Sequence, residues 1–175
     1  MWKLPNFLIL ELRNMNNNPS TTKYVMDTSM LIGFSRWIPI SLNKSFWDSL
    51  ESALQDGKWV LLDIVVNEIK RNKPLEDWCK KQKVSGFVTS ISDDDRNGGI
   101  KINNDYPMID QVTFKSETDT YIIAHALNNK IGVFSTEMRK LPTENLYKIP
   151  DVCDKLNVKS THIPKDFLES IDFNN

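Results

Sequence analysis

Residues 58–71 read KWVLLDIVVNEIKR, and this stretch decides the fold class. Its apolar run from Trp59 to Val66 is almost continuous and follows Gly57. Such a run is typical of a strand that is buried on both faces, as the strands of helix-covered parallel sheets are. The end of the stretch, VVNEIKR, predicts a turn into a helix that carries Glu68 in its first turn.

Helical and extended patterns alternate upstream of this stretch. SFWDSLESALQDG places apolar side chains on one helical face, with Ser45 as the expected N-cap and Gly57 as the stop. Still earlier, KYVM is rich in β-formers and leads into Asp27, after which TSMLIGFSRW predicts a helix. Asp27 is therefore expected at the carboxyl end of a strand.

The alternation continues downstream. SETDTYIIAHALNNK predicts a helix with Ser116 as N-cap and Asp119 at its third position, and IGVFST predicts a buried strand that ends at Glu137. PDVCDKLNV, STHI and PKDFLESI then predict a helix, a strand and a final helix. Residues 85–112 mix glycines, a proline and the acidic run 93–95, so they predict short irregular pieces with that run in a solvated turn.

This order of elements predicts a three-layer α/β/α sandwich with a mostly parallel central sheet, whose ligand site lies outside the carboxyl ends of the strands. The polar stretch NMNNNPSTT separates an N-terminal extension, residues 1–22, from a domain at 23–175. With 175 residues, 40% hydrophobic and 26% charged, the chain fits one globular domain.

Charge, cysteine content and hydropathy limit the classes of function that are expected for this chain. A formal net charge of -1 argues against a surface that attracts nucleic acid everywhere, although local basic patches still bind phosphates. Cys79 and Cys153 form no CxxC pair, so we expect two core cysteines in a cytoplasmic protein rather than a disulfide framework or a zinc site. Glu11 and Arg13 interrupt the apolar run 7–10, so no membrane segment is expected.

Four acids are expected at one edge of the sheet. Asp27 and Glu137 follow strands, Glu68 begins a helix after a strand, and Asp119 lies in the first turn of a helix beside the sheet. Carboxylates gathered in this way raise one another's pKa and persist as anions when cations neutralise them. Hard oxygen ligands suit Mg²⁺ or Mn²⁺, which bind a scissile phosphate and activate water.

Four stretches, YVMDTSMLIG, VVNEIKR, TDTYIIAHAL and VFSTE, resemble in order and approximate spacing the acidic motifs of PIN-domain nucleases. The resemblance looks closest to a VapC-like subgroup, because SFWDSLESALQDGKW and KIPDVCDKLNV resemble segments of that subgroup. It implies that Asp27, Glu68 and Asp119 are the principal metal-binding and catalytic acids. Glu137 is implied as an auxiliary fourth acid, and Ser29 as a polar residue that supports the site.

The resemblance also implies an activity and partners. Similar proteins are Mg²⁺- or Mn²⁺-dependent endoribonucleases, many of them toxins neutralised by an antitoxin protein, and they often form homodimers. Arg139 and Lys140, directly after the fourth motif, are placed to hold the phosphate of an RNA substrate. Glu137 and Ser135 depart from the aspartate and threonine that many members carry. An alternative is therefore a catalytically weak PIN-like module that binds RNA or a protein partner without cleavage.

Other interpretations remain for single residues. Each acid taken alone is also a common helix-capping or first-turn residue. A phosphatase of the haloacid dehalogenase type needs a second aspartate where Ser29 stands. His125 and His162 are not expected as general bases. A set of basic residues after the second motif predicts a solvated helix face or, alternatively, contacts with RNA phosphates next to stacking by Trp37 and Trp78; the basic residues are Lys70, Arg71, Lys73, Lys80, Lys81 and Lys83.

Overall fold

The computed structural model describes residues 23–162, whose centre is a sheet of five parallel strands. The strands are β1 (Tyr24–Met26), β2 (Trp59–Leu62), β3 (Val88–Thr89), β4 (Gly132–Phe134) and β5 (Ser160–Thr161). Their order across the sheet is β3-β2-β1-β4-β5. All strands point the same way, so their carboxyl ends form one edge.

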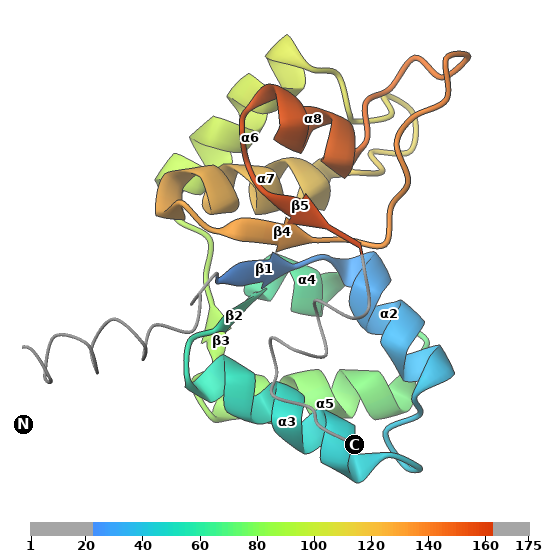
Figure 1. The fold of residues 1–175 in the computed structure, drawn as a ribbon, viewed down its shortest axis with the longest axis vertical. Helices are drawn as coiled ribbons and strands as arrows, with labels where there is room; N and C mark the ends of the chain where they lie inside the picture. The colour runs from blue at the N-terminus through green and yellow to red at the C-terminus, as the bar shows by residue number, and fades with distance from the viewer. Residues whose placement is uncertain (1–22, 163–175) are drawn as a thin grey trace, which may run out of the picture.

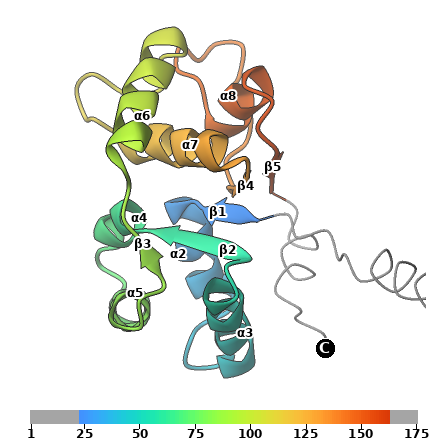
Figure 2. The same cartoon turned by 90° about the vertical axis from the view of Figure 1, so that its left-hand side faces the viewer.

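Seven helices connect these strands within residues 23–162. They are α2 (Thr28–Trp37), α3 (Lys44–Gln55), α4 (Asp63–Glu68), α5 (Lys73–Val84), α6 (Asp93–Asp105), α7 (Glu117–Asn129) and α8 (Ile149–Lys155). Figures 1 and 2 show α6, α7 and α8 over one face of the sheet and α2, α3 and α5 over the other. The predicted α/β/α sandwich with a parallel central sheet is confirmed.

The strand order reverses between β1 and β4. From β1 the chain proceeds outward to β2 and β3, then crosses to the opposite face and adds β4 and β5 on the other side of β1. Val25 of β1 accordingly lies between Val60 of β2 and Val133 of β4. In open parallel sheets, ligands bind in the crevice outside the carboxyl ends at such a reversal.

The strands are buried on both faces, as their apolar runs predict. Val25, Met26, Leu61 and Leu62 are fully inaccessible to solvent, and Trp59 is almost so. The two cysteines are also in the core, as expected. Burial raises the pKa of both thiols to about 12, so neither is a thiolate nucleophile at neutral pH.

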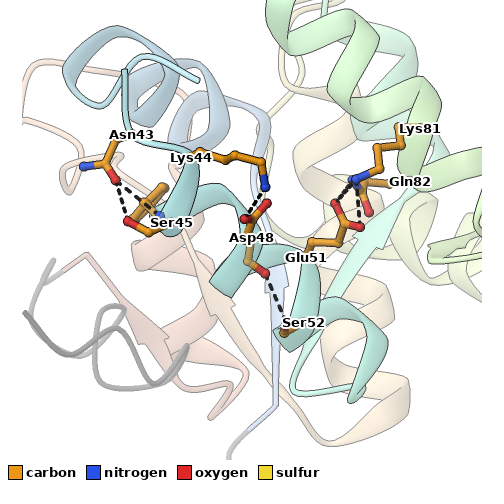
Figure 3. A network of polar contacts seen from close by, with 9 residues as sticks. Asn43, Lys44, Ser45, Asp48, Glu51, Ser52, Lys81 and Gln82 are labelled. Carbon is orange, nitrogen blue, oxygen red and sulfur yellow. Dashed lines mark hydrogen bonds and ion pairs between the residues drawn. The ribbon is translucent and has the colours of Figure 1, made fainter. Parts of the chain in front are cut away.

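Two helices of one layer are joined by polar contacts, which Figure 3 shows. The carboxylate of Glu51 on α3 accepts hydrogen bonds from Lys81 Nζ at 2.7 Å and Gln82 Nε2 at 3.1 Å on α5. Asn43, labelled in the same view, caps α3. Its side chain accepts from the Phe46 amide at 3.3 Å. The predicted cap, Ser45, instead lies inside the first turn, so that prediction is wrong by two residues.

The region 85–112 differs from its prediction. It contains β3 and α6, a helix of 13 residues, rather than short irregular pieces. The acidic run forms the first turn of α6, where Ser92 and Asp95 cap the helix reciprocally. The acidic run therefore lies in a helical turn, at the positive end of the helix dipole, where Asp93 and Asp94 are exposed and Asp95 is buried.

The second acidic motif also folds differently. The strand β2 ends at Leu62, and α4 begins at Asp63, so Glu68 is the last residue of α4 and not a first-turn residue. The predicted helix PKDFLESI and the extension 1–22 lie outside the described residues. Within residues 23–162, no helix combines the length and the apolar character needed to cross a membrane.

Candidate functional site

Asp27 lies where the strand order reverses. It follows β1 directly, and its backbone amide donates to the carbonyl oxygen of Phe134, the last residue of β4, at 3.0 Å. Its Oδ2 accepts hydrogen bonds from the hydroxyls of Ser29 and Ser135, the latter at 2.8 Å. Ser29 Oγ also lies 2.9 Å from Thr136 Oγ1. The ends of β1 and β4 thus enclose one carboxylate in hydroxyl groups.

Burial sets the electrostatics of Asp27, whose exposed fraction is only 2%. Burial raises the pKa of this carboxyl, hydrogen bonds from Ser29 and Ser135 lower it, and the charge of Glu68 raises it further. The net pKa lies above the ordinary value. The charged form therefore lacks sufficient compensation from the protein, and a proton or an external cation is favoured.

Glu68 reaches the same edge from the end of α4. Its Oε2 accepts a hydrogen bond of 2.5 Å from the hydroxyl of Thr28, the first residue of α2 and the neighbour of Asp27. Its charge raises the pKa of both Asp27 and Asp119. An acid at the C-terminus of a helix gains nothing from the helix dipole, so its position there is not explained by local helix stability.

Asp119 is the third residue of α7, as predicted, and Ser116 occupies the N-cap position. Partial burial raises the pKa of Asp119 to about 7, together with the negative charges of Asp27, Glu137 and Glu68 and against a hydrogen bond from Ser116. The negative charges of the other three predicted acids therefore all act on Asp119 at the carboxyl edge of the sheet.

Glu137 follows β4 by three residues and is partly buried. Its Oε2 accepts a hydrogen bond of 3.1 Å from the amide of Ile149, at the start of α8. Burial raises its pKa, the Ile149 amide lowers it, and the charge of Asp27 raises it again, with a net increase. We call the carboxyl edge of the sheet with Asp27, Glu68, Asp119 and Glu137 the acid edge. Glu137 joins this acid edge to α8, and its auxiliary role at a metal stays a prediction.

The chemistry of these donors fits a divalent cation, because carboxylate and hydroxyl oxygens are hard ligands of the kind that Mg²⁺ and Mn²⁺ take. The side chains are not, however, gathered as ligands of one ion. Within residues 23–162, no three Asp, Glu, His or Cys side chains lie close enough together to hold a metal. Hydroxyls of Ser29, Ser135 and Thr28 occupy carboxylate oxygens of Asp27 and Glu68 instead.

The two basic residues predicted to hold phosphate lie beyond Glu137 and already have partners. Arg139 is exposed and forms an ion pair with Asp154. Lys140 Nζ donates to the carbonyl oxygen of Glu144 at 3.1 Å and lies 4.9 Å from the ring centroid of Tyr147. An open pocket of about 370 Å³ adjoins this segment and is lined by Glu137, Met138, Arg139, Leu141, Glu144 and Lys148. Phosphate binding by Arg139 and Lys140 stays a prediction.

The contacting hydroxyls are the part of the site that sequence reasoning largely missed. Ser29 was expected near the acids, but Thr28, Ser135 and Thr136 hold carboxylates or one another as well. A signal for them exists in the sequence, since the DTS and STE stretches place hydroxyl residues directly beside Asp27 and Glu137. Such residues at the ends of adjacent parallel strands meet each other.

Comparison with known proteins adds a family. Neither the curated proteins nor the solved structures contain a significant match to this sequence. One family model matches residues 24–174, which include every described strand and helix and all four acids. The chain belongs to the DUF4411 family, a domain of unknown function.

Proposed function

We propose that this protein is a metal-dependent endoribonuclease that hydrolyses RNA phosphodiester bonds with Mg²⁺ or Mn²⁺. Asp27, Glu68 and Asp119 are its principal metal-binding acids, and Glu137 is auxiliary. The observation that supports this proposal most is the buried Asp27 carboxylate at the strand-order reversal, electrostatically coupled to the other acids. A cluster of this kind functions as a set of anions when a cation neutralises it.

Each acid has a distinct part in this proposal. Asp27 is fixed by the hydroxyls of Ser29 and Ser135, and so has a set orientation. Asp119, with a pKa of about 7, exchanges a proton near neutral pH. Glu68 is exposed and therefore accessible to a substrate. When bound, the divalent ions supply a water of lowered pKa and stabilise charge on the scissile phosphate.

The side chains that support other chemistries are engaged elsewhere. The thiols of Cys79 and Cys153 are buried and protonated at neutral pH. The ring of His125 is buried between helices, with Nδ1 3.0 Å from Asp95 Oδ2. These observations favour activation of water over attack by a protein nucleophile.

The choice of RNA as substrate rests on the resemblance of the four acidic motifs to PIN-domain nucleases. The same resemblance supports an antitoxin partner, a homodimer and a cytoplasmic setting as further parts of the proposal. A second candidate is a PIN-like module that binds RNA or a protein without cleavage. The hydroxyl bonds on Asp27 and Glu68 favour that candidate, since they occupy carboxylate oxygens that a metal would need.

A cleavage assay tests the proposal. Purified protein should cut RNA with added Mg²⁺ or Mn²⁺ and stop when the metal is chelated. Asp27→Asn and Asp119→Asn should each reduce cleavage by roughly 10²- to 10³-fold, because a metal site supplies several kcal/mol of transition-state stabilisation. Asp94→Asn, an exposed acid on α6, is the matched control and should leave cleavage unchanged. Full activity in both site variants would sink the assignment, and RNA binding without cleavage would favour the second candidate.

A further inference from the structure

A second open pocket, of about 400 Å³, lies beside the acid edge. It is lined by Ile32 and Arg36 of α2, by residues 70–72, which lie between α4 and α5, and by Lys73 and Pro74 at the start of α5. The lining includes four basic side chains and no acid: Arg36, Lys70, Arg71 and Lys73. We call this feature the basic pocket.

Three of the four cations of the basic pocket differ from the fourth in their ion pairing. Within the part of the chain that the structure describes, Arg36, Lys70 and Arg71 form no ion pair, whereas Lys73 is paired with Asp77 on its own helix. Elsewhere in this layer, Lys44 is paired with Asp48 and Lys81 with Glu51. A concave surface with several unpaired positive charges concentrates anions.

The basic pocket continues directly from the acid edge along α2. Thr28, Ile32 and Arg36 are four residues apart and therefore lie on one face of that helix. Thr28 donates to Glu68, and Ile32 and Arg36 line the pocket. The helical rise places Arg36 about 12 Å along the axis from Thr28. Lys70 also follows Glu68 by only two residues, so acids and cations share two chain segments.

The segment 70–74 is held against α2 rather than free. Asn72 donates from Nδ2 to Ser35 Oγ at 2.7 Å, and its Oδ1 accepts from the amide of Leu75 at 3.3 Å. Trp37 directly follows Arg36 in the chain and ends α2 with 70% of its surface exposed. Exposed aromatic rings next to cations are the surfaces on which single-stranded bases stack.

We propose that the basic pocket binds a backbone phosphate of single-stranded RNA, a few nucleotides from the bond at the acid edge, while Trp37 stacks on a neighbouring base. The guanidinium groups of Arg36 and Arg71 suit the two-pronged recognition of phosphate oxygens. This inference rests on the proposed function, because it names how the same site holds its substrate.

The test measures RNA binding as a function of salt. A short fluorescent single-stranded RNA is titrated with the Asp119→Asn protein in the presence of a chelator, so that no cleavage interferes. Arg36→Gln, Lys70→Gln and Arg71→Gln are then combined in that background. The pocket neutralises one phosphate, and each neutralised phosphate of a single strand contributes about 0.7 to the slope of log Kd against log salt, so the combined variant should lower the slope by about 0.7.

A matched control removes the same charge elsewhere. Lys80→Gln, Lys83→Gln and Lys101→Gln change three exposed lysines of α5 and α6 that do not line the pocket. The salt slope of this control should stay within experimental error of the parent. An equal loss in both triple variants, or an unchanged slope in the pocket variant, would overturn the assignment. If the pocket variant does not fold, Trp37→Ala alone should weaken binding about ten-fold, and unchanged affinity in that variant would contradict the proposal.

The outcome is separable from that of the proposed function. In the otherwise unchanged protein, the pocket variant should raise KM for RNA and leave kcat near its original value. If the protein cleaves RNA but the pocket variant has an unchanged salt slope, the proposal for the basic pocket is refuted and the proposed nuclease activity stands. A reduced slope in a protein that never cleaves would support the pocket and refute the nuclease.

Discussion

Two aspartates of this protein are almost equally inaccessible to solvent, but their pKa values are shifted in opposite directions. Asp27 is 2% exposed and Asp95 is 3% exposed. Asp95 lies between α6 and α7, where it accepts from the Ser92 amide at 3.1 Å and Asn128 Nδ2 at 2.9 Å, with His125 Nδ1 at 3.0 Å. Asp27 has two serine hydroxyls and, nearby, further negative charge.

The pKa directions follow from these surroundings. Burial acts to raise the pKa of Asp95, less strongly than that of Asp27 because fewer protein atoms surround Asp95, and hydrogen bonds from His125, Ser92 and Asn128 together hold the pKa of Asp95 below the ordinary value. Burial raises the pKa of Asp27 as well, and there the serines do not reverse the effect, to which Glu68 adds. The protein itself stabilises one charge. It leaves the other to a proton or a cation from solvent, and that difference separates a structural acid from a candidate functional one.

The largest effect that should sharpen this comparison is stabilisation by metal. At a Mg²⁺ or Mn²⁺ concentration of 100 times Kd, the free energy of unfolding should rise by about 2.7 kcal/mol at pH 8. The rise should be much smaller at pH 5, because protons compete for Asp27 and for Asp119, whose pKa is about 7. Thermal unfolding at both pH values measures the difference. Equal stabilisation by the metal at pH 5 and pH 8 would show that Asp27 and Asp119 do not bind it.

The same pKa values fix the sign of the metal-free pH dependence. A raised folded-state pKa means that the folded chain binds more protons than the unfolded chain between the ordinary value of 3.8 and about 7. The contribution of Asp119 to stability is therefore full below that window and is lost as pH rises through it. Asp119→Asn should remove this contribution, and chelated samples unfolded at intermediate pH values report it.

The next largest effect is expected at the structural acid. Asp95→Asn should lower the free energy of unfolding by about 2 kcal/mol, because charged hydrogen bonds to His125 and Asn128 become neutral or are lost. Urea unfolding measures the change. Cleavage per folded molecule should remain at the original level, and a selective loss of cleavage would show that Asp95 belongs to the functional site.

A smaller effect is expected at the auxiliary acid. Glu137→Gln should reduce cleavage about ten-fold, since the amide keeps an oxygen for the Ile149 amide but loses the charge that faces Asp27. Glu144→Gln is a matched control from the same loop, where Glu144 accepts from the amide of Leu141 at 2.6 Å. A thousand-fold loss in Glu137→Gln would make Glu137 a principal ligand, and an unchanged rate would remove it from the site.

The smallest effect is expected for the stability of Asp27→Asn. At pH 8 without metal, this variant should unfold with an unchanged free energy or one raised by less than about 1 kcal/mol. The amide oxygen still accepts from Ser29 and Ser135, and the repulsion from Glu68 disappears. Urea unfolding of Asp27→Asn and Asp95→Asn in parallel tests whether the free energy of unfolding changes differently in the two variants. A loss of about 2 kcal/mol in both variants would make the two aspartates equivalent.

The sequence was sufficient for the architecture and for the position of most acids. Continuous apolar runs identified the buried strands. Asp27 follows the end of a strand and Asp119 lies near the start of a helix, as predicted. Glu68 was predicted at a helix start because the apolar run WVLLDIVV does not reveal that β2 ends at Leu62. Glu68 nevertheless lies at the predicted edge of the sheet, because α4 is short and ends beside the start of α2.

The helix α6 was not predictable from local preference. Its two central glycines disfavour a helix, and only tertiary packing explains them. A methyl group on Gly99 would lie 2.5 Å from Cδ1 of Tyr121, and one on Gly98 would lie 3.0 Å from Cβ of Ala124. The glycines permit close approach to α7. A local signal did exist in Ser92 and Asp95, which form a capping box at the helix start.

The central claim is that the carboxyl edge of the sheet holds a divalent cation through Asp27 and Asp119. Calorimetric titration with Mn²⁺ at neutral pH tests it most directly, with Asp95→Asn as the control for loss of a buried acid. We predict saturable Mn²⁺ binding in the unaltered protein and in Asp95→Asn, and its loss in Asp27→Asn and Asp119→Asn. No Mn²⁺ binding in the unaltered protein, or equal affinity in all four proteins, would contradict the claim.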